Sequence, residues 1–234
     1  MNQPQNAPCR VAVAMSGGVD SAVSALLLRQ QFPEVAGVTM RLYAESDADP
    51  ESDDIRDARA VAQRLGIEHL VCDLGEQFRG GVIDDFCREY AAGRTPNPCV
   101  VCNRLIKFGA LLDFVRAKGY DTLATGHYAR LEQDAQGRVR IRVAADTSKD
   151  QSYVLWSLTQ DVLRHVRFPL GEMTKEEARA LAEQHGFVNA RRRDSQDICF
   201  IPDGDYVKFL ANYANITPTP GKYLDTDGTV IGKH

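Results

Sequence analysis

The sequence predicts an α/β fold built on a doubly wound parallel sheet, because short apolar runs alternate along the chain with segments of helical periodicity. The expected strands are residues 11–15, 35–41, 69–72 and 121–124, and the expected helices are residues 20–31, 53–65, 77–90 and 103–118. Alternation of this kind produces βαβ units, whose strands lie parallel. Ligands of such sheets bind beyond the carboxyl ends of the strands. A functional site is therefore expected among the residues that follow these strands.

The first strand and the first helix have the clearest patterns. Residues 11–15 are all apolar, as in a buried strand. In the segment that begins at residue 22, Val23, Leu26 and Leu27 recur at helical spacing. The residues between the two segments therefore form a strand-to-helix turn.

The pattern changes after residue 128. Residues 130–144 alternate across Gln136 and Gly137, which indicates a β-hairpin. Residues 161–187 are expected to be helical, with Thr174 as an N-cap. From residue 200 the strand–helix alternation is lost, and residues 221–232 have the pattern of strand, turn and strand. We therefore divide the chain into a domain of residues 1–205 and the start of a small second domain, residues 206–234.

The composition is that of a globular protein, since the 234 residues are 44% hydrophobic and 26% charged. The net charge of −4 does not by itself suggest a nucleic-acid partner. Basic groups are nevertheless concentrated in residues 88–118, namely Arg88, Arg94, Arg104, Lys107, Arg116 and Lys118. No apolar run approaches the ~18 residues of a membrane span, so a cytoplasmic location is the default expectation. That location disfavours structural disulfides among the six cysteines and favours metal binding or catalysis.

The turn after the first expected strand has the sequence Ser16-Gly17-Gly18-Val19-Asp20-Ser21. Glycine and hydroxyl residues at a strand-to-helix turn expose backbone N–H groups at the positive end of the helix dipole, where phosphate commonly binds. No Gly-Lys-[Ser/Thr] sequence closes the loop, so it is not a Walker A motif. A lysine-free loop of this kind resembles the pyrophosphatase loop of N-type ATP pyrophosphatases, which cleave ATP to AMP and pyrophosphate while adenylating an acceptor.

Cys99 and Cys102 form a Cys-x-x-Cys motif in a proline-stiffened loop at the start of an expected helix. The helix dipole, with Arg104 and Lys107, is expected to lower the pKa of Cys102. By itself the motif fits a zinc ligand pair, a redox pair or iron–sulfur ligands. No second pair of cysteines or histidines follows at zinc-finger spacing, which disfavours a structural zinc site.

Cys199 is a second candidate for thiol chemistry. It follows the triplet Arg191-Arg192-Arg193, and this cationic neighbourhood is expected to favour the thiolate. Cys9, Cys72 and Cys87 are expected to be small apolar packing residues.

Five segments, in family order, resemble the tRNA-specific 2-thiouridylases (tRNA-uridine 2-sulfurtransferases), which replace O2 of the wobble uridine U34 with sulfur. The matching segments are residues 14–21, 97–108, 125–128, 149–153 and 194–200. Other N-type ATP pyrophosphatases share only the first of them. The resemblance implies an adenine nucleotide α-hydrolase-like fold and an enzyme that adenylates uridine O2 and then transfers sulfur from a cysteine persulfide.

The resemblance also implies roles for individual residues. ATP binding is implied for Ala14, Met15, Ser16, Gly17, Gly18, Val19, Asp20, Ser21, Met40 and Gly126, with Mg²⁺ bridging the phosphates and Asp20 steadying the loop or the metal. Cys199 resembles the persulfide carrier, and Cys102 the partner nucleophile that releases its sulfur. Contact with the target base is implied for Asn97, Pro98 and Cys99, and contact with tRNA for Lys149, Asp150 and Gln151.

The implied partners are the anticodon stem-loop of tRNA and a sulfur donor, either a cysteine desulfurase or a sulfur-carrier protein. The target base must leave the anticodon stack to be reached, and the basic segment 88–118 would hold the stem phosphates. No membrane partner is expected.

Two features depart from the family pattern. Position 99 is cysteine where many members have an acidic residue, so Cys99, Cys102 and Cys199 could together ligate a [4Fe–4S] cluster. The alternative is that Cys99 lines the base pocket and persulfide chemistry at Cys199 is unchanged. Family members are also longer, with a connecting domain and a C-terminal β-barrel, and we expect the barrel to be absent here.

Two other functions stay open. Another N-type ATP pyrophosphatase, acting on a small molecule, would not need Cys102 and Cys199. An inactive, truncated tRNA-binding copy is the non-enzymatic alternative, and the intact residues 16–21 and both cysteines argue against it.

Overall fold

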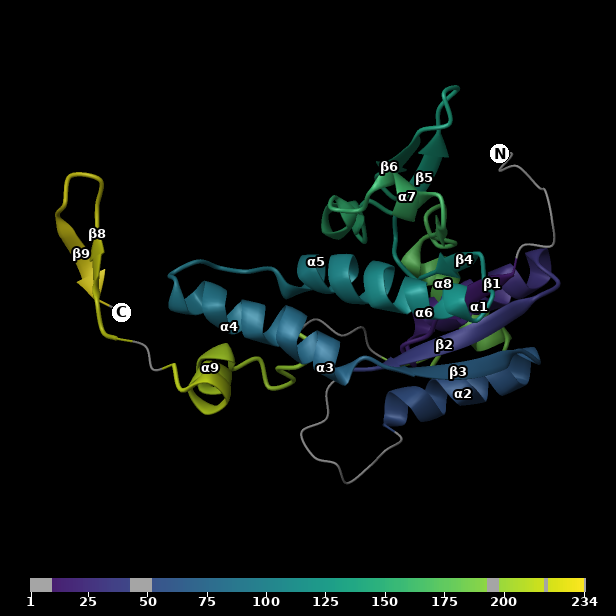
Figure 1. Cartoon of the computed structure of the whole chain (residues 1–234), viewed down its shortest axis with the longest axis horizontal. Helices are drawn as coiled ribbons and strands as arrows, with labels where there is room; N and C mark the ends of the chain where they lie inside the picture. Colours follow the sequence, from purple (N-terminus) through teal and green to yellow (C-terminus); the bar gives the residue numbers. More distant parts are fainter. Residues whose placement is uncertain (1–9, 43–51, 193–197, 217–218, 234) are drawn as a thin grey trace.

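A five-stranded parallel sheet organises the computed structural model, which describes residues 10–42, 52–192, 198–216 and 219–233 (Figure 1). Its strands are β1 (Val11–Ala14), β2 (Val35–Arg41), β3 (Glu68–Asp73), β4 (Thr122–Ala124) and β7 (Val166–Arg167). They lie in the order β3-β2-β1-β4-β7, and every neighbouring pair is parallel. The predicted α/β fold with a parallel sheet is confirmed.

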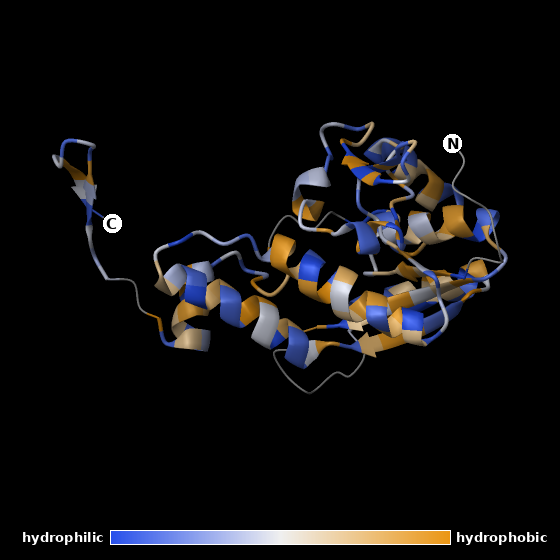
Figure 2. Cartoon of the chain, turned by 45° about the horizontal axis from the view of Figure 1, so that its top comes forward, coloured by the Kyte–Doolittle hydropathy of each residue, from blue (hydrophilic) through white to orange (hydrophobic). Residues whose placement is uncertain are grey.

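Helices cover both faces of the sheet. The helices that pack with Val11 and Val13 are α1 (Val19–Gln31), α2 (Asp53–Leu65) and α8 (Lys175–Gln184). The core cluster that contains Ala12 includes side chains of α3 (Gly75–Phe78), η1 (Arg79–Ile83), α4 (Asp84–Ala91), α5 (Pro98–Cys102), η2 (Asn103–Leu111) and α6 (Leu112–Ala117). Both faces of β1 are therefore buried, which explains its uninterrupted apolar sequence. Figure 2 shows hydrophobic residues both on the strands of the sheet and on the helices around it.

The direction of winding reverses between β1 and β4. From β1 the chain adds β2 and β3 on one side, and it later adds β4 and β7 on the other. The connections that leave the carboxyl ends of β1 and β4 therefore lie at the switch point, where doubly wound sheets bind ligands. The predicted phosphate loop is the connection that follows β1.

Most of the predicted helices are confirmed. Residues 20–31 and 53–65 correspond to α1 and α2, and α2 is capped at its C-terminus by Gly66, whose φ of +64° suits glycine. The predicted helices of residues 77–90 and 103–118 are each part of a longer helical segment that includes a π-helical stretch, η1 or η2.

The prediction of helical structure throughout residues 161–187 is wrong. A single helical turn, α7 (Gln160–Leu163), is followed by β7, and α8 begins only at Lys175. Pro169 accounts for part of this break, because the residue before a proline is biased toward extended backbone. Thr174 is the N-cap of α8 as predicted, and it forms a capping box with Glu177.

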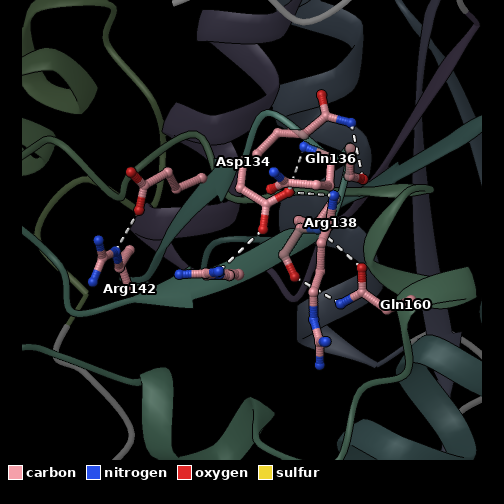
Figure 3. A network of polar contacts seen from close by, with 10 residues as sticks. Asp134, Gln136, Arg138, Arg142 and Gln160 are labelled. Atoms are coloured by element: carbon pink, nitrogen blue, oxygen red, sulfur yellow. Dashed lines mark hydrogen bonds and ion pairs between the residues drawn. The ribbon is translucent and has the colours of Figure 1, made fainter.

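The predicted hairpin is confirmed as β5 (Arg130–Gln133) paired with β6 (Val139–Arg142). Asp134 closes it, since its Oδ1 accepts hydrogen bonds from the backbone N–H groups of Gln136 and Arg138 at 3.1 and 2.9 Å (Figure 3). The side chain of Gln160 bonds both backbone groups of Val139, at 2.9 and 2.7 Å. The hairpin is therefore attached to the start of α7.

The C-terminal part contains α9 (Tyr206–Ala214), which the sequence pattern did not predict, and the predicted strand pair, observed as β8 (Lys222–Leu224) and β9 (Val230–Lys233). Tyr206 stacks on Tyr90 of α4 with ring centroids 5.0 Å apart. The β8–β9 hairpin stands away from the sheet in Figures 1 and 2. The boundary at residues 205 and 206 stays a prediction. No helix that the structure describes is long and apolar enough to cross a membrane.

Candidate active site

The loop between β1 and α1 is fixed by its own hydrogen bonds. Ser21 Oγ donates to the Gly18 carbonyl at 3.0 Å and accepts from the Ser16 N–H at 3.2 Å. Asn189 Nδ2 donates to the carbonyl of Gly17, which has a φ of +69° that favours glycine. No side-chain hydrogen bond caps α1 at Gly18, and the first N–H groups of a helix have no partner within it. This geometry suits an anion.

Asp20, in the first turn of α1, joins three distant parts of the chain. Lys175 Nζ lies 2.8 Å from both carboxylate oxygens, and the Tyr128 hydroxyl donates to Oδ1 at 2.9 Å. The Lys175 side chain is only 7% exposed and that of Asp20 is 32% exposed. Both oxygens contact the ammonium group, and this pairing steadies the loop. The role of Asp20 as a Mg²⁺ ligand stays a prediction.

Gly126, in the connection after β4, lies against the start of α1. A Cβ atom at this position would lie 3.0 Å from Asp20 Cβ and from the backbone nitrogen of Ser21, so any larger residue would push the start of α1 away by a few tenths of an ångström. Met40 lies near the carboxyl end of β2, beside β1. The switch point thus brings the loop after β1 together with Gly126, and Met40 lies at the end of the adjoining strand.

Two of the candidate thiols lie on α5. Asn97 caps this helix, since its Oδ1 accepts from the N–H groups of Cys99 and Val100 at 3.1 and 3.4 Å. Pro98 and Cys102 are buried, whereas Cys99 and Asn97 are exposed. The three residues expected to face the target base, 97–99, therefore form the cap and first turn of the helix that carries Cys102.

Cys199 lies close enough to Cys102 and Cys99 for charges on the three thiols to interact. Phe200, the next residue, anchors this segment in the core, with its ring centroid 5.4 Å from that of Phe86 on α4. The structure therefore brings Cys199 to α5, although 97 residues separate it from Cys102 in sequence. Residues 194–197 of the same motif lie outside the described residues.

The expectation that positive charge makes these thiols acidic is wrong. Burial raises the pKa of Cys102; Lys107 opposes this change without overcoming it, and Cys99 adds to it. Cys199 is exposed overall, yet enough protein surrounds its thiol that loss of hydration raises the pKa to about 11, with further increases from Cys102 and Cys99. Both groups are therefore protonated thiols at neutral pH in this conformation.

Ligation of a [4Fe–4S] cluster by Cys99, Cys102 and Cys199 stays a prediction. Within residues 10–42, 52–192, 198–216 and 219–233, no three histidine, cysteine, aspartate or glutamate side chains are placed to hold a metal ion. Cys72, Cys87, Cys99, Cys102 and Cys199 are free thiols. Cys72 and Cys87 are buried packing residues as predicted, and Cys9 lies outside the described residues.

Residues 149–151 are half-buried beside the connection after β4. The Gln151 N–H donates to the Tyr128 carbonyl at 2.8 Å, and Gln151 Oε1 accepts from the Tyr128 N–H at 3.0 Å. Asp150 accepts from the backbone N–H of Ala144 at 2.8 Å and from the Ser152 hydroxyl at 2.7 Å. Tyr128 therefore connects this stretch directly to Asp20.

A further contact connects the same stretch to the thiols. Asn103, the buried residue after Cys102, donates through Nδ2 to the Val154 carbonyl of η3 (Ser152–Leu155) at 3.1 Å. Consecutive contacts thus run from the cysteine helix through η3, residues 149–151 and Tyr128 to Asp20.

Sequence reasoning missed Lys175 and Asn189. Both lie more than 150 residues from the loop that they contact, and no local pattern distinguishes them from other lysines and asparagines. Only the packing of α8 and its following turn against α1 identifies them.

Residues 9–203 match the family described as tRNA methyl transferase HUP domain. The chain belongs to this family. The resemblance to tRNA-specific 2-thiouridylases is also confirmed by its curated relatives. The chain is 50% identical over 241 residues to "tRNA-specific 2-thiouridylase MnmA" of Magnetococcus marinus, and 48% identical over 230 residues to the protein of the same name from Treponema denticola.

These alignments cover 100% and 96% of this chain. They cover 66% and 63% of the two relatives, so the chain spans about two thirds of their length. A solved structure titled as a predicted subunit of tRNA methyltransferase from Methanocaldococcus jannaschii is 19% identical, with a TM-score of 0.44 over 75% of this chain and 74% of that one.

Proposed function

We propose that this chain carries the ATP-binding and sulfur-transferring part of a tRNA 2-thiouridylase that acts on U34. The observation that carries the proposal is the run of contacts from the cysteine helix to Asp20, through Val154, Gln151 and Tyr128. A thiolating enzyme needs its sulfur carrier and its ATP site to act on one base, and these contacts join the two. The names of the relatives supply the substrate class.

The adenylation step uses the loop after β1. The N-terminal N–H groups of α1 bind the phosphates of ATP, with Gly126 and Met40 near the nucleoside. Uridine O2 attacks the α-phosphate, and pyrophosphate leaves. The Mg²⁺ that accompanies ATP neutralises phosphate charge, and Asp20 holds the loop through Lys175 and Tyr128.

The sulfur step uses Cys199 and Cys102. A persulfide on Cys199 delivers its terminal sulfur to C2 of the adenylated uridine, and AMP leaves with the former O2. As the persulfide S–S bond breaks, the Cys102 sulfur bonds to Cys199 Sγ, which gives a disulfide that a thiol reductant then opens. A cysteine desulfurase or a sulfur-carrier protein supplies the persulfide sulfur, in the cytoplasm.

The tRNA-binding surface extends from residues 97–99 to residues 149–151. Tyr153 and Trp156, which follow the second stretch, are 63% and 74% exposed. Exposed aromatic rings are suited to stacking on unpaired bases. The basic residues of segment 88–118 bind the phosphates of the anticodon stem, and residues 206–234 begin a second domain.

The test is complementation of a strain that lacks the gene, followed by nucleoside analysis of its tRNA. Wild-type gene should restore wobble 2-thiouridine, whereas Ser21→Ala, which removes both loop hydrogen bonds of Ser21 Oγ, should not. Ser24→Ala is the matched control, because Ser24 Oγ is buried on α1 without a hydrogen-bond partner.

Two outcomes would contradict the proposal. Unchanged 2-thiouridine in the deletion strain, with ATP–pyrophosphate exchange by the purified chain, would indicate a pyrophosphatase that acts on a small molecule. Binding of tRNA without any exchange would indicate an inactive tRNA-binding copy.

A further inference from the structure

The phosphate loop has no lysine of its own, but the fold supplies one. Lys175, the first residue of α8, places its ammonium group 2.8 Å from both oxygens of Asp20, in the first turn of α1. The two residues are 155 positions apart in sequence. A cation therefore lies at the helix N-terminus where the phosphates of ATP are proposed to bind.

The backbone around Lys175 holds this ammonium group in place. Thr174 and Glu177 form the capping box that starts α8. The Lys175 N–H donates to Asp146 Oδ2 at 3.2 Å, and the side chain is 7% exposed. The position of the charge is thus determined by the start of α8 and not by a flexible surface side chain.

Asp20 creates an electrostatic difficulty for a phosphate site, because its carboxylate lies beside the N–H groups that would bind the anion. A triphosphate carries several negative charges, and an unpaired carboxylate within a few ångströms would repel it. We propose that Lys175 makes the loop able to accept a nucleoside triphosphate by neutralising Asp20, an inference that rests on the proposed function. Lys175 is in this sense a positioning residue, which acts through Asp20.

The number of phosphates on the ligand distinguishes this electrostatic role of Lys175 from a purely structural one. If Lys175 only stabilised the fold, its loss would weaken the binding of all adenine ligands alike. If it cancels the charge of Asp20, its loss should weaken binding in proportion to the number of phosphates on the ligand, and removal of the Asp20 charge should restore binding.

The experiment is calorimetric titration of the purified full chain with ATP, ADP, AMP and adenosine, each with Mg²⁺. For Lys175→Gln we expect Kd for ATP to rise roughly 10- to 100-fold, with smaller increases for ADP and AMP and none for adenosine. Lys175→Arg keeps the charge and should retain most of the ATP affinity. Lys208→Gln is the matched control, since Lys208 forms an exposed pair with Asp203 and should leave all four affinities unchanged.

The double variant Asp20→Asn with Lys175→Gln has neither charge of the pair. It keeps the test decisive even if Lys175→Gln alone fails to fold. This double variant should bind ATP within a few-fold of the wild type, and its thermal unfolding shows whether it is folded. An equal loss of affinity for all four ligands, or a folded double variant that binds ATP more than tenfold more weakly, would overturn the inference. Absence of ATP binding by the wild-type chain would instead overturn the proposed function.

Discussion

The two halves of the candidate site differ in how complete they are without a ligand. Around the loop after β1, Ser21, Asn189 and Lys175 hold their partners at 2.8–3.2 Å. Around the thiols, burial and neighbouring sulfur atoms raise the pKa of Cys102 and Cys199, so neither is a thiolate at neutral pH. The nucleotide half of the site, which is the loop after β1 with Asn189 and Lys175, is therefore preorganised. In the sulfur half, which is Cys99, Cys102 and Cys199, the thiols of Cys102 and Cys199 still have to lose a proton before they can react.

The largest effect should come from a change that removes sulfur chemistry and leaves the loop intact. We expect Cys199→Ser to abolish tRNA thiolation, because a hydroxyl group cannot carry a persulfide. The Kd for ATP should stay at the wild-type value, since the contacts of Asp20 are elsewhere. The measurements are 2-thiouridine formation with a persulfide donor and calorimetric titration with ATP.

Cys87→Ala is the control, because Cys87 is a buried core thiol on α4. It should lower thermal stability slightly and preserve thiolation. If Cys199→Ser keeps full thiolation activity, the assignment of the sulfur half is wrong. If Cys199→Ser strongly weakens ATP binding, the nucleotide half and the sulfur half do not function independently of one another.

The converse change disrupts the preorganised half. In Gly126→Val, Cβ alone would lie 3.0 Å from Asp20 and Ser21 atoms, and the valine methyl groups would displace the start of α1. A misplacement of about 1 Å slows an enzymatic step by roughly 100-fold, so tRNA-dependent ATP–pyrophosphate exchange should fall by up to about that factor. Gly80→Val is the control, because a Cβ at Gly80 has no neighbour within 4 Å.

The same variants should leave the thiols unaffected. Alkylation of Cys199 by iodoacetamide, followed by peptide mass spectrometry, should proceed at the wild-type rate in Gly126→Val. A large change in that rate would show that the loop and the thiols respond to one another in the free protein.

The parts of this molecule that were predictable from sequence are those determined by neighbours along the chain. The all-apolar run of β1, the glycine turn after it and the N-cap at Thr174 are local patterns, and each appears in the structure. β7 has only two residues, too few for a period to be recognised, and its place beside β4 depends on long-range pairing.

The pKa values of the thiols show a second limit of prediction from sequence, because their shifts have the opposite sign to the one expected. The helix start and Lys107 near Cys102 are visible in the sequence and favour the thiolate. The loss of hydration on folding is not visible there, and for Cys102 it is the larger effect. The Lys175–Asp20 pair was unpredictable for the same reason, since it depends on which helices pack together.

A pH profile sharpens the description of the sulfur half. Because the pKa of Cys199 is raised to about 11, its thiolate fraction is small at pH 7 and grows as pH rises toward that value. The alkylation rate of Cys199 should therefore increase about tenfold for each pH unit up to pH 10, whereas an unperturbed thiol levels off near its pKa of ~8.5. A rate that levels off by pH 8 would show that the thiol is already activated.

The smallest expected effect is on tRNA affinity, from a change at the exposed surface next to both halves of the site. Trp156, the single tryptophan of the chain, is 74% exposed just after η3, whose Val154 contacts Asn103 beside the thiols. Stacking of a base on an aromatic ring stabilises binding by ~1–3 kcal/mol, so Trp156→Ala should weaken tRNA binding by about fivefold, the lower end of that range. Trp156→Phe should retain most of the affinity, and ATP binding should be unchanged in both variants. Because no other tryptophan emits, quenching of wild-type fluorescence by anticodon stem-loop RNA reports the contact directly. Unquenched emission at saturating RNA, with wild-type affinity in Trp156→Ala, would place the RNA away from η3 and remove Trp156 from the proposed tRNA surface.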